Sequence, residues 1–412
     1  MNRVSKLIVV TAVAGAAVLT WESGAASAEV PQEAVAESTI ATEIIVWLEP
    51  GSDPVDVAEV NGVELIDTLV GHRNIHLYGS VEPVADNKVR KVFDKDDRVR
   101  YAEPNHEGAS ADGNRAHAWP SDQRPVAVGG EPTDPDADPL RLDLVHQAGT
   151  GEGAVVAILD TGIDPDHELF DGRARSGWDF VDDDPDADDD RAGLDADDDG
   201  LPDESWGHGT HVAGIVAQVA PDAEIVGYRV LDSEGTGRVF AVAAAIFDAT
   251  DRGVDVINLS FGLDHQSKSK MLRDALKYAK NSGVIVVAAA GNEGLGHKRY
   301  PAAEKDVMAV GAHDRSAEQL APFANHGDWV EVAAPGVGVL SALPGGGFGT
   351  WSGSSMAAPF VAGQAALLAA LAPDEKPKKV IEAIRKSSHK PGRGNKVKHG
   401  LIDILGSIGE LD

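Results

Sequence analysis

Short apolar runs and helical stretches alternate in a regular order between residues 38 and 104. Strands are predicted where apolar residues cluster or alternate with polar ones, over Thr42–Leu48, Val63–Leu69, Asn74–Gly79 and Val99–Glu103. Two helices are predicted between these strands, over Pro54–Val60 and Val84–Phe93. The resulting order, β-α-β-β-α-β, is typical of a small ferredoxin-like α+β unit.

The pattern changes after residue 139, where continuous apolar runs alternate with longer helical stretches. The apolar runs predict buried strands over Ala154–Leu159, Glu224–Val230, Val254–Ser260, Val284–Ala290 and Val307–Gly311. Helices are predicted over His208–Val219, Arg238–Arg252, Lys268–Ser282, Ser355–Leu371 and Lys378–Ser387. Strands that are apolar on both faces belong in a parallel sheet that helices cover on both sides. The sequence therefore predicts a three-layer α/β fold with a mostly parallel sheet, and functional residues just after its strands.

The first residues have the pattern of a targeting segment. Arg3 and Lys6 precede the apolar run Leu7–Thr20, and Ala26-Ser27-Ala28 follows it as a cleavage site. Because the run is short for a membrane span, it predicts a signal peptide over residues 1–28 and a secreted protein. The alternative is an uncleaved anchor helix.

A change in composition separates the two folding units. Residues 107–138 are rich in Gly, Ala, Asp and Pro and hold few large apolar residues. A structureless stretch of this length is too long for an ordinary loop, so it indicates a linker. We therefore expect an N-terminal unit over residues 29–106 and a second unit over residues 139–412.

Charge and cysteine usage exclude several classes of function. The 412 residues hold 36 Lys and Arg against 67 Asp and Glu, a formal net charge of −31. Such a chain repels phosphate groups, so nucleic acid is not expected as a partner. The chain has no cysteine, which excludes a disulfide framework, a thiolate metal site and a cysteine nucleophile.

Three segments carry residues suited to acyl transfer. Asp160 follows a predicted strand, His208 opens a predicted helix between two glycines, and Ser355 opens another helix. Each alone is weakly informative, because an Asp or Ser in such a place is usually a cap. Together they supply a nucleophile, a base that takes its proton and a carboxylate that orients the base.

The chain from roughly residue 139 to residue 410 resembles the subtilisin-like serine proteases. The matching motifs are Val-Ala-Ile-Leu-Asp160-Thr-Gly-Ile, His208-Gly-Thr-His-Val-Ala-Gly, Ala-Ala-Ala-Gly-Asn292-Glu-Gly and Gly-Ser-Ser355-Met-Ala-Ala-Pro. Their order, Asp then His then Ser, is that of subtilisin. The resemblance implies Asp160 as the orienting carboxylate, His208 as general base and acid, Ser355 as nucleophile and Asn292 as oxyanion donor. His211 could in principle pair with His208 on a metal, but the spacing differs from that of metal hydrolases, and a packed structural role is expected.

The resemblance also implies a substrate cleft and an inhibitory propeptide. Two segments match the family's edges that pair with an extended substrate: Gly235-Thr236-Gly237 and Ser260-Phe261-Gly262. Arg299 falls at the base of the specificity pocket, where it would favour an acidic side chain before the scissile bond; an Arg turned to solvent is the alternative. Residues 29–106 resemble the family's propeptide, which implies an intramolecular inhibitor and folding aid.

The expectation for metal departs from the family. Its usual calcium loop is missing, because Ile215–Pro221 runs through that position without an insertion. An insertion before His208 instead holds twelve Asp between Asp182 and Asp203. Within it, four carboxylates have calcium-loop spacing around the turn residue Gly200: Asp195, Asp197, Asp199 and Asp203. The bidentate Glu of such loops is absent, since Trp206 stands there, and a solvated acidic loop is the alternative.

These observations predict a secreted, calcium-dependent serine endopeptidase made as a self-processed zymogen. We expect a monomer that acts on polypeptides and has no stable membrane association. One alternative is a calcium-binding extracellular protein that uses a peptidase scaffold. Another is a catalytically dead homologue acting as a binding protein, which would be expected to lack a member of the triad or the oxyanion Asn; this chain has all four.

Overall fold

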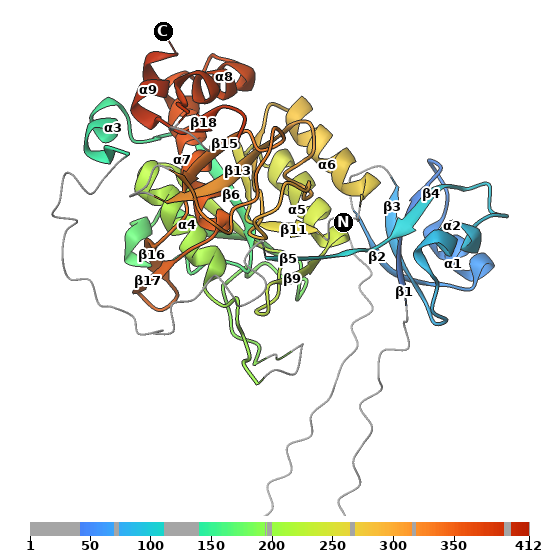
Figure 1. The fold of residues 1–412 in the computed structure, drawn as a ribbon. Helices are drawn as coiled ribbons and strands as arrows, with labels where there is room; N and C mark the ends of the chain where they lie inside the picture. Colours follow the sequence, from blue (N-terminus) through green and yellow to red (C-terminus); the bar gives the residue numbers. More distant parts are fainter. Residues whose placement is uncertain are drawn as a thin grey trace, which may run out of the picture. The chain divides into compact units, whose positions relative to one another are not determined.

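A computed structural model describes residues 42–69, 74–110, 140–193, 195, 200–263, 268–314, 319–390 and 397–411. The expected signal peptide lies outside the described residues, as does most of the expected linker. Two main sheets organise the described chain, a small antiparallel one and a large, mostly parallel one (Figure 1).

The N-terminal unit has the predicted ferredoxin-like arrangement, with strand order β2-β3-β1-β4. Its elements are β1 (Thr42–Leu48), α1 (Pro54–Asn61), β2 (Glu64–Thr68), β3 (Ile75–Ser80), α2 (Val89–Val92) and β4 (Val99–Pro104). The predicted helix over Val84–Phe93 is only half formed. A 3₁₀ turn, η1 (Asp86–Lys88), precedes α2, and Lys88 at φ −111° and ψ −10° interrupts the helix. A helix this short has little stability of its own.

Alternating side chains of β1 bury both faces of the small sheet. Ile44 and Val46 lie in a core with residues of α1 and α2. Ile45 and Trp47 point the other way, into a core shared with α5 (Val239–Asp251) and α6 (Lys270–Asn281). The two faces therefore tie this unit to its own helices and to the helices of the larger unit.

The large sheet has the order β18-β15-β13-β12-β10-β6-β8-β7, with β14 paired to β13. Every pairing along this order is parallel, and only β14 is antiparallel. The strands are β6 (Val155–Asp160), β7 (Ala174–Asp179), β8 (Glu224–Arg229), β10 (Val256–Leu259), β12 (Ile285–Ala289), β13 (Val307–Asp314), β14 (Gln319–Leu320), β15 (Val332–Pro335) and β18 (Gly400–Leu401). The five predicted strands form the centre of this sheet.

Helices cover both faces of the large sheet, as the apolar strands predict. Val156 and Ile158 of β6 lie in one core with α4 (His208–Val219) and α7 (Ser354–Leu371). Ala157 and Leu159 lie in the other core, with α5 and α6. Helix α7 is long and apolar enough to cross a bilayer, but 83% of it is buried inside the protein. It is therefore the central helix of the core.

Smaller elements complete the larger unit. The helices are α3 (Leu142–Ala148), η3 (Glu168–Phe170), α8 (Pro377–Ser387) and α9 (Ile404–Gly409), and the hairpin strands are β16 (Val339–Leu343) and β17 (Gly347–Trp351). Only Ser352 and Gly353 separate this hairpin from α7.

The first residues of the expected linker form a strand. β5 (Glu107–Ser110) lies between β9 (Thr236–Arg238) and β11 (Phe261–Leu263) in a three-stranded sheet (Figure 1). Both pairings are antiparallel. The sequence gives no sign of this strand, because Glu-Gly-Ala-Ser has no strand propensity of its own. Its hydrogen-bonding partners on both sides supply the missing stability.

Candidate active site

Asp160 and His208 meet at the carboxyl end of the central strand β6. Asp160 is the last residue of that strand and His208 the first residue of α4. His208 Nδ1 lies 2.6 Å from Asp160 Oδ1. Because a carboxylate can only accept, Nδ1 carries the hydrogen, and Nε2 is left as the basic nitrogen. Both side chains are buried, with 0% and 3% exposure for Asp160 and His208, so little water competes for this bond.

Glycine allows the close approach of α4 to the end of β6. A Cβ atom at Gly209 would lie 2.0 Å from the carbonyl oxygen of Gly162 and 3.0 Å from Asp160 Cβ. Helix α4 begins after Gly207, whose φ of +88° lies in the left-handed region that favours glycine. The two glycines around His208 thus have a steric reason to be there.

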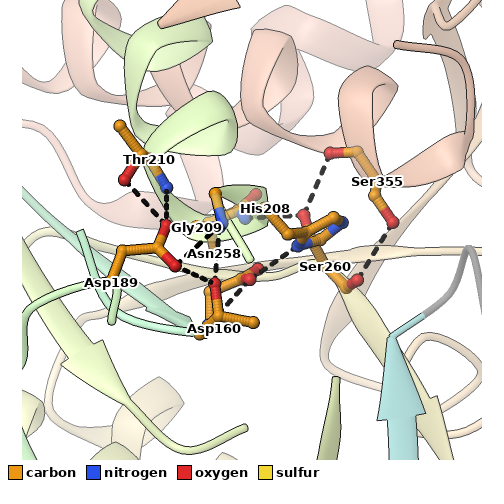
Figure 2. Close-up of polar contacts among 10 residues, drawn as sticks. Asp160, Asp189, His208, Gly209, Thr210, Asn258, Ser260 and Ser355 are labelled. Atoms are coloured by element: carbon orange, nitrogen blue, oxygen red, sulfur yellow. Dashed lines mark hydrogen bonds and ion pairs between the residues drawn. The ribbon is translucent and has the colours of Figure 1, made fainter. Parts of the chain in front are cut away.

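Ser355 lies in the first turn of α7, beside the loop that follows β10. Its Oγ donates a 3.0 Å hydrogen bond to the carbonyl of Ser260. Ser260 Oγ donates in return to the carbonyl of Ser355 at 3.0 Å, and accepts from Asn258 Nδ2 at 3.0 Å. Figure 2 shows Ser355 and Ser260 joined in this way, with His208 beside them. These bonds fix the start of α7 against the end of β10.

Asn292 follows β12 and contacts the residue before Ser355. Its Oδ1 accepts a 2.8 Å hydrogen bond from the backbone N–H of Ser354. Ser354 Oγ accepts a 2.9 Å bond from the N–H of Gly291. Since Oδ1 is engaged with the α7 backbone, the donor end of the Asn292 amide is Nδ2. The orientation suits a donor for an oxyanion that forms beside Ser355.

The expected cleft segments border the strand β5. Thr236 and Gly237 pair with Ala109 and Gly108 on one side, and Gly262 pairs with Ala109 on the other. Phe261 is opposite Ser110, one position from Ser260. Gly235 forms the turn before β9, with φ +77°. The structure therefore brings both segments together around one extended chain, which is how a sheet edge binds a peptide.

Arg299 has a partner that sequence reasoning missed. Its guanidinium forms an ion pair with Glu293, and its Nη1 donates to the carbonyl of Leu263 at 3.3 Å. Glu293 also accepts a hydrogen bond from Asn325 Nδ2. Both charged side chains are about one third exposed, at 28% for Arg299 and 34% for Glu293. The positive charge of Arg299 is therefore partly cancelled within the chain itself.

Asp189 is a second residue that sequence reasoning missed. It belongs to the acidic insertion, but it is only 4% exposed. Its carboxylate accepts hydrogen bonds from the backbone N–H of Gly207, from the hydroxyl of Thr161, and from the N–H and hydroxyl of Thr210. Burial raises the pKa of Asp189 to about 7, although the hydrogen bonds from Gly207 and Thr210 oppose the rise. In a run of twelve Asp nothing in the sequence marks this one.

His211 has a structural place, as expected. Its Nε2 donates to the carbonyl of Gly349 at 3.1 Å. Its ring stacks on Trp351, with centroids 4.7 Å apart and planes at 5°. Burial lowers the pKa of His211 to about 3, so the ring is neutral. Trp351 also stacks against the ring of His208, at 5.9 Å.

Only part of the expected calcium loop belongs to the described residues. Asp197 and Asp199 lie outside them. Asp195 Oδ2 accepts from the N–H of Gly200 at 2.9 Å, and Asp203 Oδ1 accepts from two backbone N–H groups. Within the part of the chain that the structure describes, no group of three or more His, Asp or Glu residues is arranged to hold a metal ion. The four-carboxylate site stays a prediction.

Comparison with known proteins identifies the relatives of the chain. The sequence profile of the Subtilase family matches residues 151–401. A thermophilic serine proteinase from Bacillus sp. (strain AK1) is 36% identical over 354 residues, which are 83% of this chain and 79% of that protein. Thermitase from Thermoactinomyces vulgaris is 41% identical over 229 residues, 53% of this chain and 76% of that protein.

Solved structures agree with the fold. Fervidolysin from Fervidobacterium pennivorans, described as a keratinolytic enzyme related to subtilisin, matches with a TM-score of 0.72 at 24% identity. The match covers 89% of this chain but 61% of that one, and it supports the fold alone. A cold-adapted subtilisin-like serine proteinase matches with a TM-score of 0.53 at 34% identity, over 62% of this chain and 91% of that one.

Proposed function

Because the chain belongs to the subtilase family of serine endopeptidases, we propose that it is a secreted peptidase made as a zymogen that cuts itself. The 2.6 Å contact between Asp160 and His208 carries the catalytic part of this proposal. A buried carboxylate beside Nδ1 holds the imidazole in the tautomer whose Nε2 can accept a proton. It also stabilises the imidazolium that forms during the reaction.

The proposed reaction proceeds in two acyl transfers. Ser355 Oγ turns from the Ser260 carbonyl, attacks the carbonyl carbon of the scissile bond and passes its proton to His208 Nε2. Asn292 Nδ2 and the backbone N–H of Ser355 stabilise the negative oxygen, a contribution of about 3–4 kcal/mol for one such donor. The C–N bond breaks as His208 gives its proton to the leaving amine. Water, deprotonated by His208, then cleaves the ester and restores Ser355.

The position of β5 supports the proposed zymogen. This strand is hydrogen-bonded between the two segments that an extended substrate would pair with. Ser110, its last residue, is opposite Phe261, next to the carbonyl that accepts the Ser355 hydroxyl. The same strand would block the cleft until it is released. We therefore expect self-cleavage within a few residues after Ser110.

Further contacts support residues 29–106 as an intramolecular inhibitor. Asn105 Oδ1 accepts a 2.9 Å hydrogen bond from the N–H of Phe240, in the first turn of α5. Ile45 and Trp47 are buried against α5 and α6. A unit held by such contacts would also help those two helices to assemble during folding.

Calcium remains part of the proposal through the loop from Asp195 to Asp203. Its ligands would be the carboxylates of Asp195, Asp197, Asp199 and Asp203. The oxygen donors suit calcium, and Gly200 has the left-handed φ of +86° that a tight loop needs. The ion would neutralise neighbouring carboxylates and stabilise the fold, and it would take no part in the acyl transfer.

Hydrolysis of casein by purified protein tests the proposed function. We expect clearing of a casein film by the wild type and none by Ser355→Ala, which lacks only the hydroxyl oxygen, with circular dichroism as the check that the variant is folded. A calcium-binding extracellular protein on a peptidase scaffold would bind calcium and leave the film intact. Equal clearing by both proteins would show that Ser355 is not the nucleophile.

A further inference from the structure

We infer that Asp189 is a positioning residue for the catalytic pair, and that it sets the distance between Asp160 and His208. This inference rests on the proposed peptidase function. Asp189 precedes the expected calcium loop, and its carboxylate is directed toward the catalytic residues (Figure 2). None of its contacts involves Asp195 or Asp203 in the described chain.

One side of the Asp189 network holds the helix that carries His208. Gly207, immediately before His208, donates its N–H to Asp189 Oδ1 at 2.9 Å. Thr210 donates its N–H at 3.1 Å and its hydroxyl at 2.7 Å to Asp189 Oδ2. These donors lie at the start of α4, where backbone N–H groups have no partner within the helix. The carboxylate of Asp189 therefore holds the residue before His208 and the residue two positions after it, Gly207 and Thr210.

The other side of the network holds the strand end that carries Asp160. The hydroxyl of Thr161 donates to Asp189 Oδ1 at 3.1 Å and accepts from the N–H of Gly209 at 3.0 Å. The backbone N–H of Thr161 donates to Asp160 Oδ1 at 2.9 Å, the same oxygen that contacts His208. Asp189 is thus bonded to both partners of the catalytic pair through neighbouring residues.

The chemistry of the carboxylate suits this role. All four contacts are donors to Asp189, and only an ionised carboxylate accepts from every one of them. The raised pKa of Asp189, about 7, means that the carboxylate is ionised at alkaline pH. An asparagine would present an NH₂ group to at least one of these donors. It would loosen the start of α4 without touching β9 or β11, where substrate binds.

Asp189→Asn, with Asp188→Asn as matched control, tests the inference. Asp188 is the adjacent carboxylate, and its Oδ1 accepts from Ser176 Oγ at 3.2 Å, outside this network. At pH 9, on a peptide anilide and with processed enzyme, we expect kcat of Asp189→Asn to fall about 10- to 100-fold, as for a misplaced catalytic group. KM should stay within about twofold. Asp188→Asn should keep both values near those of the wild type.

A spectroscopic signature provides a measure that is independent of turnover. The Nδ1 proton of His208, in its short bond to Asp160, should give a strongly deshielded ¹H NMR signal in the wild type and in Asp188→Asn. We expect this signal to be lost or shifted upfield in Asp189→Asn. If the wild type shows the signal but cleaves no peptide, the proposed function fails while the positioning role is still measured.

Thr210 supplies a second pair of variants if Asp189→Asn does not fold. Thr210→Val removes the hydroxyl that donates to Asp189 and accepts from the N–H of Asp164 at 3.0 Å, and it keeps the shape of the side chain. Thr210→Ser retains both bonds. We expect the larger loss of kcat for Thr210→Val, with KM unchanged. A kcat and NMR signal for Asp189→Asn equal to those of Asp188→Asn would overturn the inference. So would equal kcat values for the two Thr210 variants.

Discussion

The carboxylate of Glu103 in β4 caps helix α6 through Ser269. Glu103 Oε1 accepts from Ser269 Oγ at 2.7 Å and from the N–H of Met271 at 2.9 Å, and Oε2 accepts from the N–H of Lys270 at 2.9 Å. Ser269 is itself the N-cap of α6. A negative charge is favoured at this end of a helix. The smaller unit thus completes the first turn of a helix in the larger one.

Loss of this cap should weaken the inhibition by residues 29–106. Hydrogen bonds to a charged group contribute roughly 1.5–3 kcal/mol each. We expect Glu103→Gln to shorten the lag before activity appears in freshly folded full-length protein, by about tenfold. Progress curves on a peptide anilide measure the lag. Glu49→Gln, which alters an exposed carboxylate 3.5 Å from Arg100, is the control. An unchanged lag for Glu103→Gln would show that the cap does not hold the inhibitor in place.

Ser355→Ala should remain uncut. Because self-cleavage needs the nucleophile, we expect the variant to accumulate as a chain that retains residues 29–138 in a protease-free host. Mass spectrometry and N-terminal sequencing measure this. The wild type should begin within a few residues after Ser110. Normal maturation of Ser355→Ala would mean that another protease does the cutting.

The regular parts of this molecule were predictable because their signals are local. The five central strands are continuous apolar runs, and His208–Val219 has the bounds that the sequence predicts. Asp160, His208 and Ser355 were candidates because each follows a predicted strand or opens a predicted helix. Their expected roles, and the choice of Asn292, came from the resemblance of the surrounding motifs to the subtilisin-like proteases.

The contacts that sequence reasoning missed depend on how segments fold onto one another, whether the partners are far apart in the sequence or within one loop. Asp189 differs from its neighbours only in the donors that surround it, which come from the ends of β6 and α4. The Glu293–Arg299 pair depends on how the loop after β12 folds back. β5 is a strand only because it forms backbone hydrogen bonds with β9 and β11. None of these relations has a period or a motif along the chain.

Calcium should stabilise the protein through the loop from Asp195 to Asp203. A ligand at 100 times its dissociation constant stabilises the folded state by about 2.7 kcal/mol. We expect excess chelator to lower the melting temperature of the processed wild type, measured by calorimetry. The double variant Asp197→Ala, Asp199→Ala should lose most of this dependence. A melting temperature that chelator leaves unchanged would count against the site.

The ion pair of Arg299 with Glu293 should govern the preference for acidic side chains before the scissile bond. Glu293 offsets part of the positive charge of Arg299, so only the remainder of that charge can attract a substrate carboxylate. We expect Glu293→Gln to raise the ratio of kcat/KM for a Glu substrate to kcat/KM for a Phe substrate by about fivefold. This factor corresponds to about 1 kcal/mol, as expected for a partly exposed ion pair. Arg299→Asn should lower the same ratio below that of the wild type. Identical ratios for all three proteins would mean that Arg299 lies outside the specificity pocket.

Protonation of His211 should contribute to unfolding in acid. Its pKa is lowered to about 3 in the folded state from an ordinary value of 6.5, so the unfolded chain binds more protons between these values. The contribution of neutral His211 to the free energy of unfolding is fully present above about pH 6.5. It is lost as the pH falls toward 3, by an amount on the order of 5 kcal/mol. His211→Phe keeps the stack on Trp351 and cannot titrate. Denaturant unfolding at pH 7 and 4.5 should show a smaller loss for this variant than for the exposed-site control His297→Phe; equal losses would contradict the linkage.

Asp160 ends a strand that has parallel neighbours on both sides, β10 and β8. Its backbone carbonyl also accepts from the N–H groups of Val230 and Leu231. The backbone of Asp160 is therefore anchored in the middle of the large sheet, where local opening requires neighbouring strands to separate. The backbone amide proton of Asp160 should exchange with solvent only as fast as the whole larger unit unfolds. We therefore expect heat to abolish catalysis and unfold the larger unit in the same transition.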